Sequence, residues 1–144
     1  MKIIPRPAPP QLPYSLHDMH IIGIDADGDI LTLHFQYGFV ETTPPWRQVD
    51  GSIRFLGVDW DFCYVYRFST TGNEGRFTGE KQFLHKFVEN FHNSGFSVID
   101  ETYGFNQSKL AGYLLQSGET QECIIEIYHT GDMQYLLEEE VHAL

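Results

Sequence analysis

Three side chains that bind transition metals lie at helical spacing in the middle of the chain. His85, Glu89 and His92 are separated by four and then three residues, so on a helix they would lie within an arc of roughly 60°. Two imidazoles and a carboxylate can bind a divalent metal, and Glu89 and His92 have the Glu-x-x-His spacing of carboxylate-bridged metal sites. The favoured interpretation is the ordinary polar face of an exposed helix. The alternative is a small metal- or ligand-binding enzyme that uses these three residues.

Aromatic side chains form a second candidate site, for a ligand or a protein partner. Trp46 and Trp60 lie in predicted connections, where binding residues concentrate, and the acids on either side of Trp60 could help to bind a sugar or a cation. Tyr64 and Tyr66 follow on one face of a predicted strand. An alternative is a ligand pocket lined by the aromatic side chains of this region, which are Phe55, Phe62, Tyr64, Tyr66 and Phe68.

Acidic side chains predict a different kind of site, a surface for a basic protein. The chain has 20 acidic and 9 basic residues and a formal net charge of -11, and no Lys or Arg follows Lys109. A charge of this sign repels a phosphate backbone and disfavours nucleic-acid binding. The alternative is a solvated face that keeps the protein soluble and monomeric. The candidate partner-binding residues are Glu119, Glu122, Glu126, Glu138, Glu139 and Glu140.

Other patterns typical of enzymes are weak or absent. The acidic segment 25–29 does not fit a calcium-binding loop, because Ile30 and Gln36 occupy the positions of its glycine and its bidentate glutamate. The sequence has no phosphate-binding loop, no dinucleotide-binding glycine motif and no Gly-x-Ser-x-Gly. Cys63 and Cys123 lie in apolar runs and are expected to be buried, where a thiolate is disfavoured. We therefore expect a non-catalytic protein without a cofactor.

The chain divides into an arm and one domain. Five of the seven prolines fall between Pro5 and Pro13, and proline disfavours both helix and central strand. Residues 1–13 are therefore expected to be an extended arm that packs on its own domain; the alternatives are contact with a neighbouring protomer or with an aromatic groove. Residues 14–144 have the length of a single domain. No run approaches the ~18 apolar residues of a membrane span and no signal-peptide pattern is present, so we expect a cytoplasmic protein.

Hydrophobic periodicity predicts an α+β fold, with a mainly antiparallel sheet of about seven strands and one long amphipathic helix packed on it. A hairpin is expected over residues 19–36 around an Asp-Gly turn, with Ile24 opposite Leu31. A second hairpin is expected over residues 52–68. Both should contribute strands to the same sheet.

The second half of the chain predicts the helix and the remaining strands. Apolar residues at helical spacing indicate a helix from Thr78 to about Asn93. Leu114 is expected opposite Cys123 across a turn at residues 117–120. The last apolar residues fit either a short tail helix that begins near Asp132 or a strand. The expected strands are 96–103, 109–116, 121–129 and, as that alternative, 133–137.

The first hairpin carries a resemblance to known families. Leu16-His17-Asp18 is followed by Ile-x-Ile-Asp-x-Asp-Gly-Asp-x-Leu-x-Leu. Over residues 16–35 this resembles the first hairpin of several uncharacterised small bacterial domain families, including immunity-type proteins of toxin systems. The resemblance implies a non-catalytic, acidic bacterial protein that neutralises a toxin by binding it, and it assigns no individual residue a role. With the charge pattern, it predicts a protein-binding module of the immunity-like or adaptor kind.

Overall fold

The structure is a computed structural model that describes residues 1–7, 11–69 and 78–138. The described residues lie mostly in β-sheet, with 58% of them in strands and 7% in helices. The helical segments are the 3₁₀ helix η1 (Trp60–Phe62) and α1 (Leu84–Glu89). The strands are β1 (Tyr14–Ser15), β2 (His20–Asp27), β3 (Ile30–Gln36), β4 (Phe39–Glu41), β5 (Gln48–Val49), β6 (Gly51–Phe55), β7 (Tyr64–Phe68), β8 (Gly79–Phe83), β9 (Gly95–Gly104), β10 (Gln107–Gln116), β11 (Glu119–Tyr128) and β12 (Met133–Leu137).

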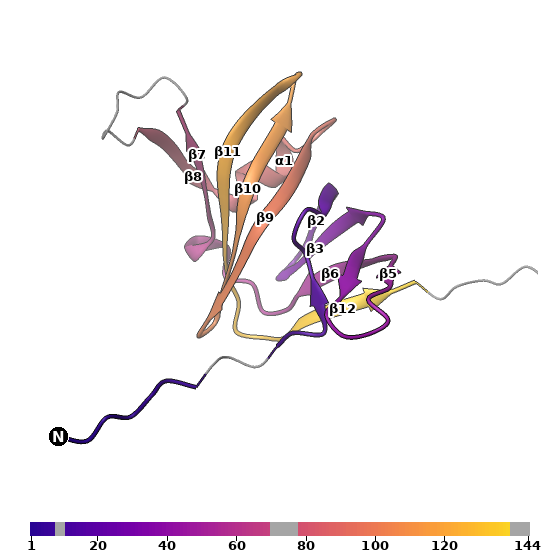
Figure 1. Cartoon of the computed structure of the whole chain (residues 1–144). Coiled ribbons are helices and arrows are strands. Elements are labelled where there is room, and N and C mark those ends of the chain that lie inside the picture. The colour runs from indigo at the N-terminus through magenta and orange to yellow at the C-terminus, as the bar shows by residue number, and fades with distance from the viewer. Residues whose placement is uncertain (8–10, 70–77, 139–144) are drawn as a thin grey trace, which may run out of the picture.

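Within the described residues, nine strands form one antiparallel sheet in the order β12-β6-β3-β2-β9-β10-β11-β7-β8. Figure 1 shows it as two diverging parts, which we call the first half-sheet (β12-β6-β3-β2) and the second half-sheet (β9-β10-β11-β7-β8). A short pairing of β2 with β9 joins them, with His20 opposite Ser97 and Ile21 opposite Phe96. Strands β1, β4 and β5 form a separate small sheet.

One hydrophobic core lies against both half-sheets. Leu33 and Phe55 of the first half-sheet belong to the same buried cluster as Leu110 and Ile125 of the second. Helix α1 contributes buried side chains such as Phe87 to this cluster and contacts β2, β7, β8 and β11. The helix therefore lies on the core side of the second half-sheet and leaves the opposite face of that half-sheet open.

The expected α+β fold with a long helix is wrong. Residues predicted to begin the helix form β8 instead, which pairs with β7 so that Phe83 lies opposite Tyr64. Helix α1 begins only at Leu84, ends at Glu89, and has no side-chain cap at its start. No helix among the described residues reaches seven residues. Strand pairing overrides the helical spacing of the apolar residues at this position. Pairing with β7 satisfies the backbone hydrogen-bonding groups of residues 79–83.

The first hairpin forms, but its register differs from the prediction. The turn residues are Gly28 and Asp29, so Asp27 lies opposite Ile30. Ile24 consequently faces Leu33 rather than Leu31. A β-bulge at residue 22 then reverses the alternation: Ile21 is fully buried, whereas Ile22 is 56% exposed.

The hairpin of β10 and β11 shows a similar shift without a change of face. Leu114 lies opposite Gln121 rather than Cys123, because the turn is formed by Ser117 and Gly118, both with positive φ. A shift of two residues keeps each side chain on its own face, since strand side chains alternate with period two. The buried residues are accordingly those predicted: Leu110, Gly112, Leu114, Cys123, Ile125 and Ile127.

The second predicted hairpin is wrong in its pairing, although both strands exist. Strand β6 pairs with β3 and β12 in the first half-sheet, whereas β7 pairs with β11 and β8 in the second. The connection between them crosses from one half-sheet to the other, and Val58 within it forms a bridge with His129. At the other end of the chain the tail helix is wrong and the alternative strand over residues 133–137 is confirmed as β12.

The proline-rich arm has two described parts. Gln11 Nε2 donates to the Thr42 carbonyl at 3.2 Å, and Thr42 N donates to the Pro13 carbonyl at 3.0 Å, so residues 11–13 pack along their own domain. Residues 1–7 are exposed and extend away from the sheets in Figure 1. Among the described residues, no helix has the length and apolar character needed to cross a membrane.

Candidate functional site

The open face of the second half-sheet gathers aromatic and charged side chains. Strand alternation places Tyr64 and Tyr66 of β7 on this face, next to Glu126 and Ile124 of β11. The neighbouring strand β8 adds two more side chains, because Phe83 lies opposite Tyr64 and Lys81 opposite Tyr66. We call the side chains of β7, β8 and β11 on this side the aromatic face: Tyr64, Tyr66, Lys81, Phe83, Glu122, Ile124 and Glu126.

Ring and cation contacts order the centre of the aromatic face. The rings of Tyr64 and Phe83 stack with centroids 5.5 Å apart. The Lys81 ammonium lies 4.0 Å from the centroid of Tyr64 and 5.6 Å from that of Tyr66, which is within the range of a cation–π interaction. The Tyr64 hydroxyl donates to the Asp61 carbonyl at 3.0 Å. The rings are thus held in place while Phe83 remains 54% exposed.

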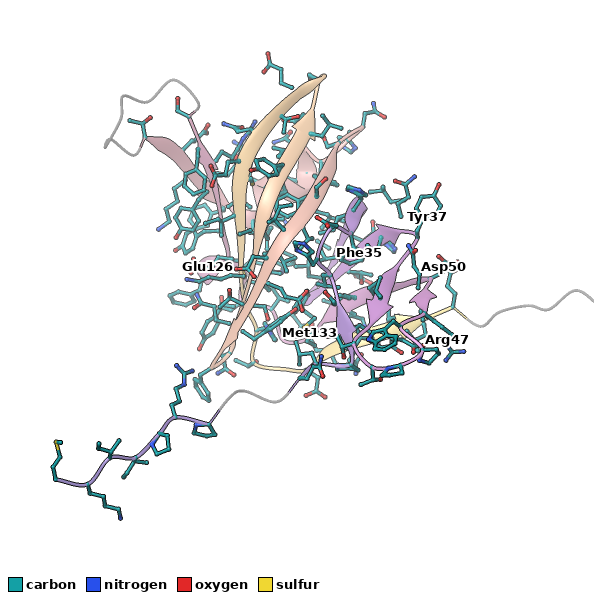
Figure 2. All side chains as sticks on the ribbon, viewed as in Figure 1. Phe35, Tyr37, Arg47, Asp50, Glu126 and Met133 are labelled. Carbon is teal, nitrogen blue, oxygen red and sulfur yellow. The ribbon has the colours of Figure 1, made fainter. Side chains whose placement is uncertain are left out.

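The candidate acids are divided between two parts of the molecule. Glu119 and Glu122 are exposed near the β10–β11 turn, and Glu126 accepts a hydrogen bond from Gln107 Nε2 at 2.6 Å. Strand alternation places Glu122 and Glu126 on one side of β11 and Glu119 on the other. Glu138 follows β12, where its backbone N–H donates to the Asp50 carbonyl. Figure 2 shows Glu126 and Asp50 on opposite halves of the molecule. Glu139 and Glu140 lie outside the described residues.

The two tryptophans lie apart from the aromatic face. Trp46 is 62% exposed in the loop between β4 and β5. Trp60 lies in η1, where its Nε1 donates to the Gly28 carbonyl at 2.7 Å and its ring contacts that of His85. Within the described residues, no ring contact links either tryptophan to Tyr64 or Tyr66. Trp60 instead borders a hollow of about 420 Å³ together with Asp29, Asp59 and Asp61.

The alternative aromatic pocket is not formed. Phe55 is buried in the core with its ring against His129. Phe62 is 57% exposed, and Tyr64 lies on the open face. These side chains point to different sides of the sheet, so they do not line a common cavity.

The three candidate metal ligands are only partly brought together. His85 Nδ1 lies 3.7 Å from Glu89 Oε1 on the exposed side of α1. His92 follows the end of the helix, and its carbonyl accepts a hydrogen bond from the Ser94 hydroxyl. Among the described residues, no group of three His, Cys, Asp or Glu side chains could hold a metal ion. The metal-dependent alternative therefore lacks its third ligand.

Both cysteines are buried free thiols, as predicted. Burial raises the pKa of Cys63 to about 11 and that of Cys123 to about 12. Each is therefore protonated at neutral pH and is a poor nucleophile.

A buried serine–histidine pair was missed by sequence reasoning. Ser108 Oγ lies 2.8 Å from His129 Nε2, and His129 Nδ1 lies 2.9 Å from the Gly131 carbonyl. The carbonyl can only accept, so Nδ1 carries the proton and Nε2 accepts the serine hydroxyl. Ser108 is 1% exposed and His129 is 9% exposed. No substrate reaches this pair, and its role is to connect β10 to the segment after β11.

A half-buried carboxyl lies at the core side of β9. Glu101 Oε2 accepts a hydrogen bond from Leu16 N at 2.8 Å, and burial is the largest cause that raises the pKa of Glu101 above its ordinary value. The hydroxyl of Tyr135 is also buried, and the described residues give it no hydrogen-bond partner. Burial, followed by the nearby Glu101 carboxylate, raises the pKa of Tyr135 to about 12.

Replacing Glu101 by glutamine should stabilise the protein at about pH 8 and have little effect at about pH 4. Because the pKa is raised in the folded state, that state binds more protons than the unfolded state, and stability falls as pH rises above the ordinary pKa of 4.5. Glutamine stays neutral and can still accept from Leu16 N. Urea unfolding at both pH values measures the difference. A Glu101→Gln variant less stable than wild type at the higher pH would contradict this expectation.

Comparison with known proteins assigns the chain to no family. No protein-family model matches the chain, and no curated protein or solved structure matches it. Lys81 and Phe83 are members of the aromatic face that the sequence did not reveal, because they fell within the predicted helix. Residues 80–83 are Glu-Lys-Gln-Phe and show no polar–apolar alternation, so local periodicity offered no signal for a strand there.

Proposed function

We propose that this protein is a binding module whose aromatic face contacts a basic protein partner. The observation that supports the proposal is the cluster of Tyr64, Tyr66 and Phe83 on the face opposite the core and α1, where Phe83 is exposed and both tyrosines are half-buried. Large aromatic side chains held by their neighbours contribute much of the binding energy at protein interfaces and lose little conformational entropy on binding.

The surroundings of this cluster resemble the anatomy of an interface. Protein interfaces combine an apolar centre, rich in aromatic residues, with a polar rim. Here the rings form the centre, and Glu122 lies towards one end as an exposed acidic rim. Glu119 is exposed at the start of β11 but projects to the other side of the strand. Two groups of residues that are separate in the sequence, the tyrosines of β7 and the acids of β11, therefore form one surface.

Charge favours a basic partner over an acidic one. The chain has a formal net charge of -11, and the exposed Glu122 of the rim adds a local negative field. Complementary charge accelerates association and excludes like-charged partners. The resemblance of residues 16–35 to immunity-type proteins supports the same kind of partner, a protein that is neutralised by being bound. The free thiols support the cytoplasm as the proposed compartment.

Selection of random peptides displayed on phage against the immobilised chain tests the proposal. The selected peptides should carry net positive charge, and their affinity should fall as salt is added. The Tyr66→Ala variant should lose about 2 kcal/mol of binding free energy, or roughly thirtyfold in Kd, because it removes a ring from the centre of the face. Isothermal titration calorimetry with a synthetic copy of the best peptide gives this value.

The Trp46→Ala variant is the matched control. It removes another exposed aromatic side chain, at a loop outside the aromatic face, and should leave the affinity unchanged. Circular dichroism should show the same fold for both variants. The proposal fails if the selected peptides are acidic, or if Trp46→Ala weakens binding as much as Tyr66→Ala.

A further inference from the structure

A carboxylate, an imidazole and a hydroxyl are connected on the outward face of the first half-sheet. His34 Nε2 lies 2.5 Å from Asp25 Oδ2, and His34 Nδ1 lies 3.1 Å from Ser52 Oγ. The three residues come from adjacent strands: Asp25 from β2, His34 from β3 and Ser52 from β6. Pairing of β3 with β6 sets Ser52 directly opposite His34. Residues distant in sequence are thereby brought into one hydrogen-bonded row.

The direction of these hydrogen bonds follows from their chemistry. An ionised carboxylate only accepts, so the proton on the neutral imidazole lies on Nε2 and is donated to Asp25. The lone pair of Nδ1 then faces Ser52, whose hydroxyl can donate to it. This is the arrangement of an activated serine: a base within hydrogen-bond reach of the hydroxyl, oriented by a third group.

The row is accessible to solvent. The side chains of Asp25 and His34 are 75% and 42% exposed, and Ser52 is half-buried. Arg54 follows on the same face of β6, two residues or about 7 Å along the strand. Its Nε and Nη2 donate to Gln134 Oε1 at 3.0 and 2.7 Å, which fixes a positive charge near Ser52.

Two other serine–histidine pairs in the described residues lack one of these features. Ser97 Oγ lies 2.7 Å from His20 Nδ1, but the described residues give the other ring nitrogen of His20 no carboxylate partner. Ser108 and His129 are hydrogen-bonded but buried. Of the three pairs, that of Ser52 and His34 alone combines a hydroxyl contact, a carboxylate and access from solvent.

We propose that Ser52 is a nucleophile for acyl transfer from small activated esters, with His34 as its general base and Asp25 as the residue that positions His34. Ser52 Oγ bonds to the acyl carbon while its proton passes to His34 Nδ1. The bond from that carbon to the leaving oxygen breaks, and Nδ1 returns the proton to this oxygen, which releases an alcohol. Water, deprotonated by Nδ1, then attacks the acyl carbon, the bond from that carbon to Ser52 Oγ breaks, and Nδ1 returns the proton to Oγ, which releases the carboxylic acid and restores Ser52. The Arg54 guanidinium stabilises the negative charge that develops on the carbonyl oxygen.

Diisopropyl fluorophosphate tests the nucleophile directly. Ser52 Oγ bonds to phosphorus, fluoride leaves, and the serine proton is taken up by His34. Peptide mass spectrometry of the full chain should find the adduct at Ser52, formed faster than any adduct at Ser97. General-base catalysis contributes roughly 10²–10⁴-fold in enzymes, so His34→Gln should slow labelling at least about tenfold at this open site. Ser97→Ala should leave the rate of labelling at Ser52 unchanged.

Hydrolysis of p-nitrophenyl acetate gives a second measurement and tests the positioning role. Release of p-nitrophenolate should fall to the uncatalysed rate in Ser52→Ala and decrease in Arg54→Met. Asp25→Asn should slow it, and Asp25→Glu should restore part of the rate, because a carboxylate is again available to His34. All the substituted residues are at the surface, and circular dichroism verifies folding. The proposal is overturned if Ser52 carries no adduct, if Ser52 and Ser97 react equally fast, or if His34→Gln leaves both rates unchanged.

Discussion

Replacing Phe96 by alanine should lower the free energy of unfolding by about 3–5 kcal/mol, the range observed when a large buried aromatic side chain is removed. Phe96 is 1% exposed and lies opposite the fully buried Ile21 in the short pairing of β2 with β9. This pairing joins the two half-sheets, so the cavity left by the ring would lie where they meet. Thermal unfolding should show a midpoint lower by roughly 10–15 °C.

Phe105→Ala is the matched control for this substitution. It removes the same side chain from the turn between β9 and β10, where Phe105 is 92% exposed. The free energy of unfolding should change by no more than about 0.5 kcal/mol, as is usual for surface positions. Equal losses in the two variants would show that the core does not close over the β2–β9 pairing.

Replacing Gly112 by alanine should also destabilise the protein, lowering its free energy of unfolding by about 3 kcal/mol or more. Gly112 lies where a β-bulge shifts the register of β10 against β9, so that Ala111 faces Asp100 and Gly112 faces Val98. A Cβ at this position would lie 1.8 Å from the Ser97 carbonyl oxygen. Because the obstacle is backbone, β9 would have to move away from β10 to accommodate the methyl group.

Gly104→Ala provides the comparison for Gly112. Gly104 ends β9, has no heavy atom within 4 Å of the place that an added Cβ would occupy, and does not have a positive φ. Alanine there should be neutral or should stabilise the protein by about 0.4–1 kcal/mol, because it restricts the unfolded chain. Denaturant unfolding of both variants measures the difference. A Gly112→Ala protein with wild-type stability would contradict the bulge at this position.

The pairing of β9 with β10 also matters for the proposed binding function. Strands β9 and β10 support β11, which carries Glu122 and Glu126 of the aromatic face. A variant that separates β9 from β10 should therefore weaken peptide binding as well as stability. The Tyr66→Ala variant should affect binding with little effect on the core, since Tyr66 lies on the outer side of β7.

The sequence by itself determined most of the strands and which of their residues are buried. Leu31 and Leu33 alternate with the polar Thr32 and His34, and both leucines are buried. Alternation is a local property with period two, so it survives a shift of two residues in register, such as that between β10 and β11. For the same reason the prediction placed Tyr64 and Tyr66 together on one face.

Only the tertiary structure decided which strands pair beyond the two predicted hairpins, β2 with β3 and β10 with β11. Adjacent strands β6 and β7 go to different half-sheets, and the pairing of β7 with β8 converts the start of the predicted helix into a strand. These outcomes depend on contacts between distant segments, which local periodicity does not encode. The bulge at Ile22 is of the same kind, because it places Ile21 rather than Ile22 in the core shared by the two half-sheets.

The two surfaces proposed for function show the same division. Tyrosines and acids were each recognised from the sequence, but their union on one face required β7 to lie beside β11. The row of Asp25, His34 and Ser52 required β3 to lie between β2 and β6. Residue type and alternation are local properties that can be read directly from the amino-acid sequence. Which distant strands lie side by side depends on packing of the whole core, so only the tertiary structure reveals it.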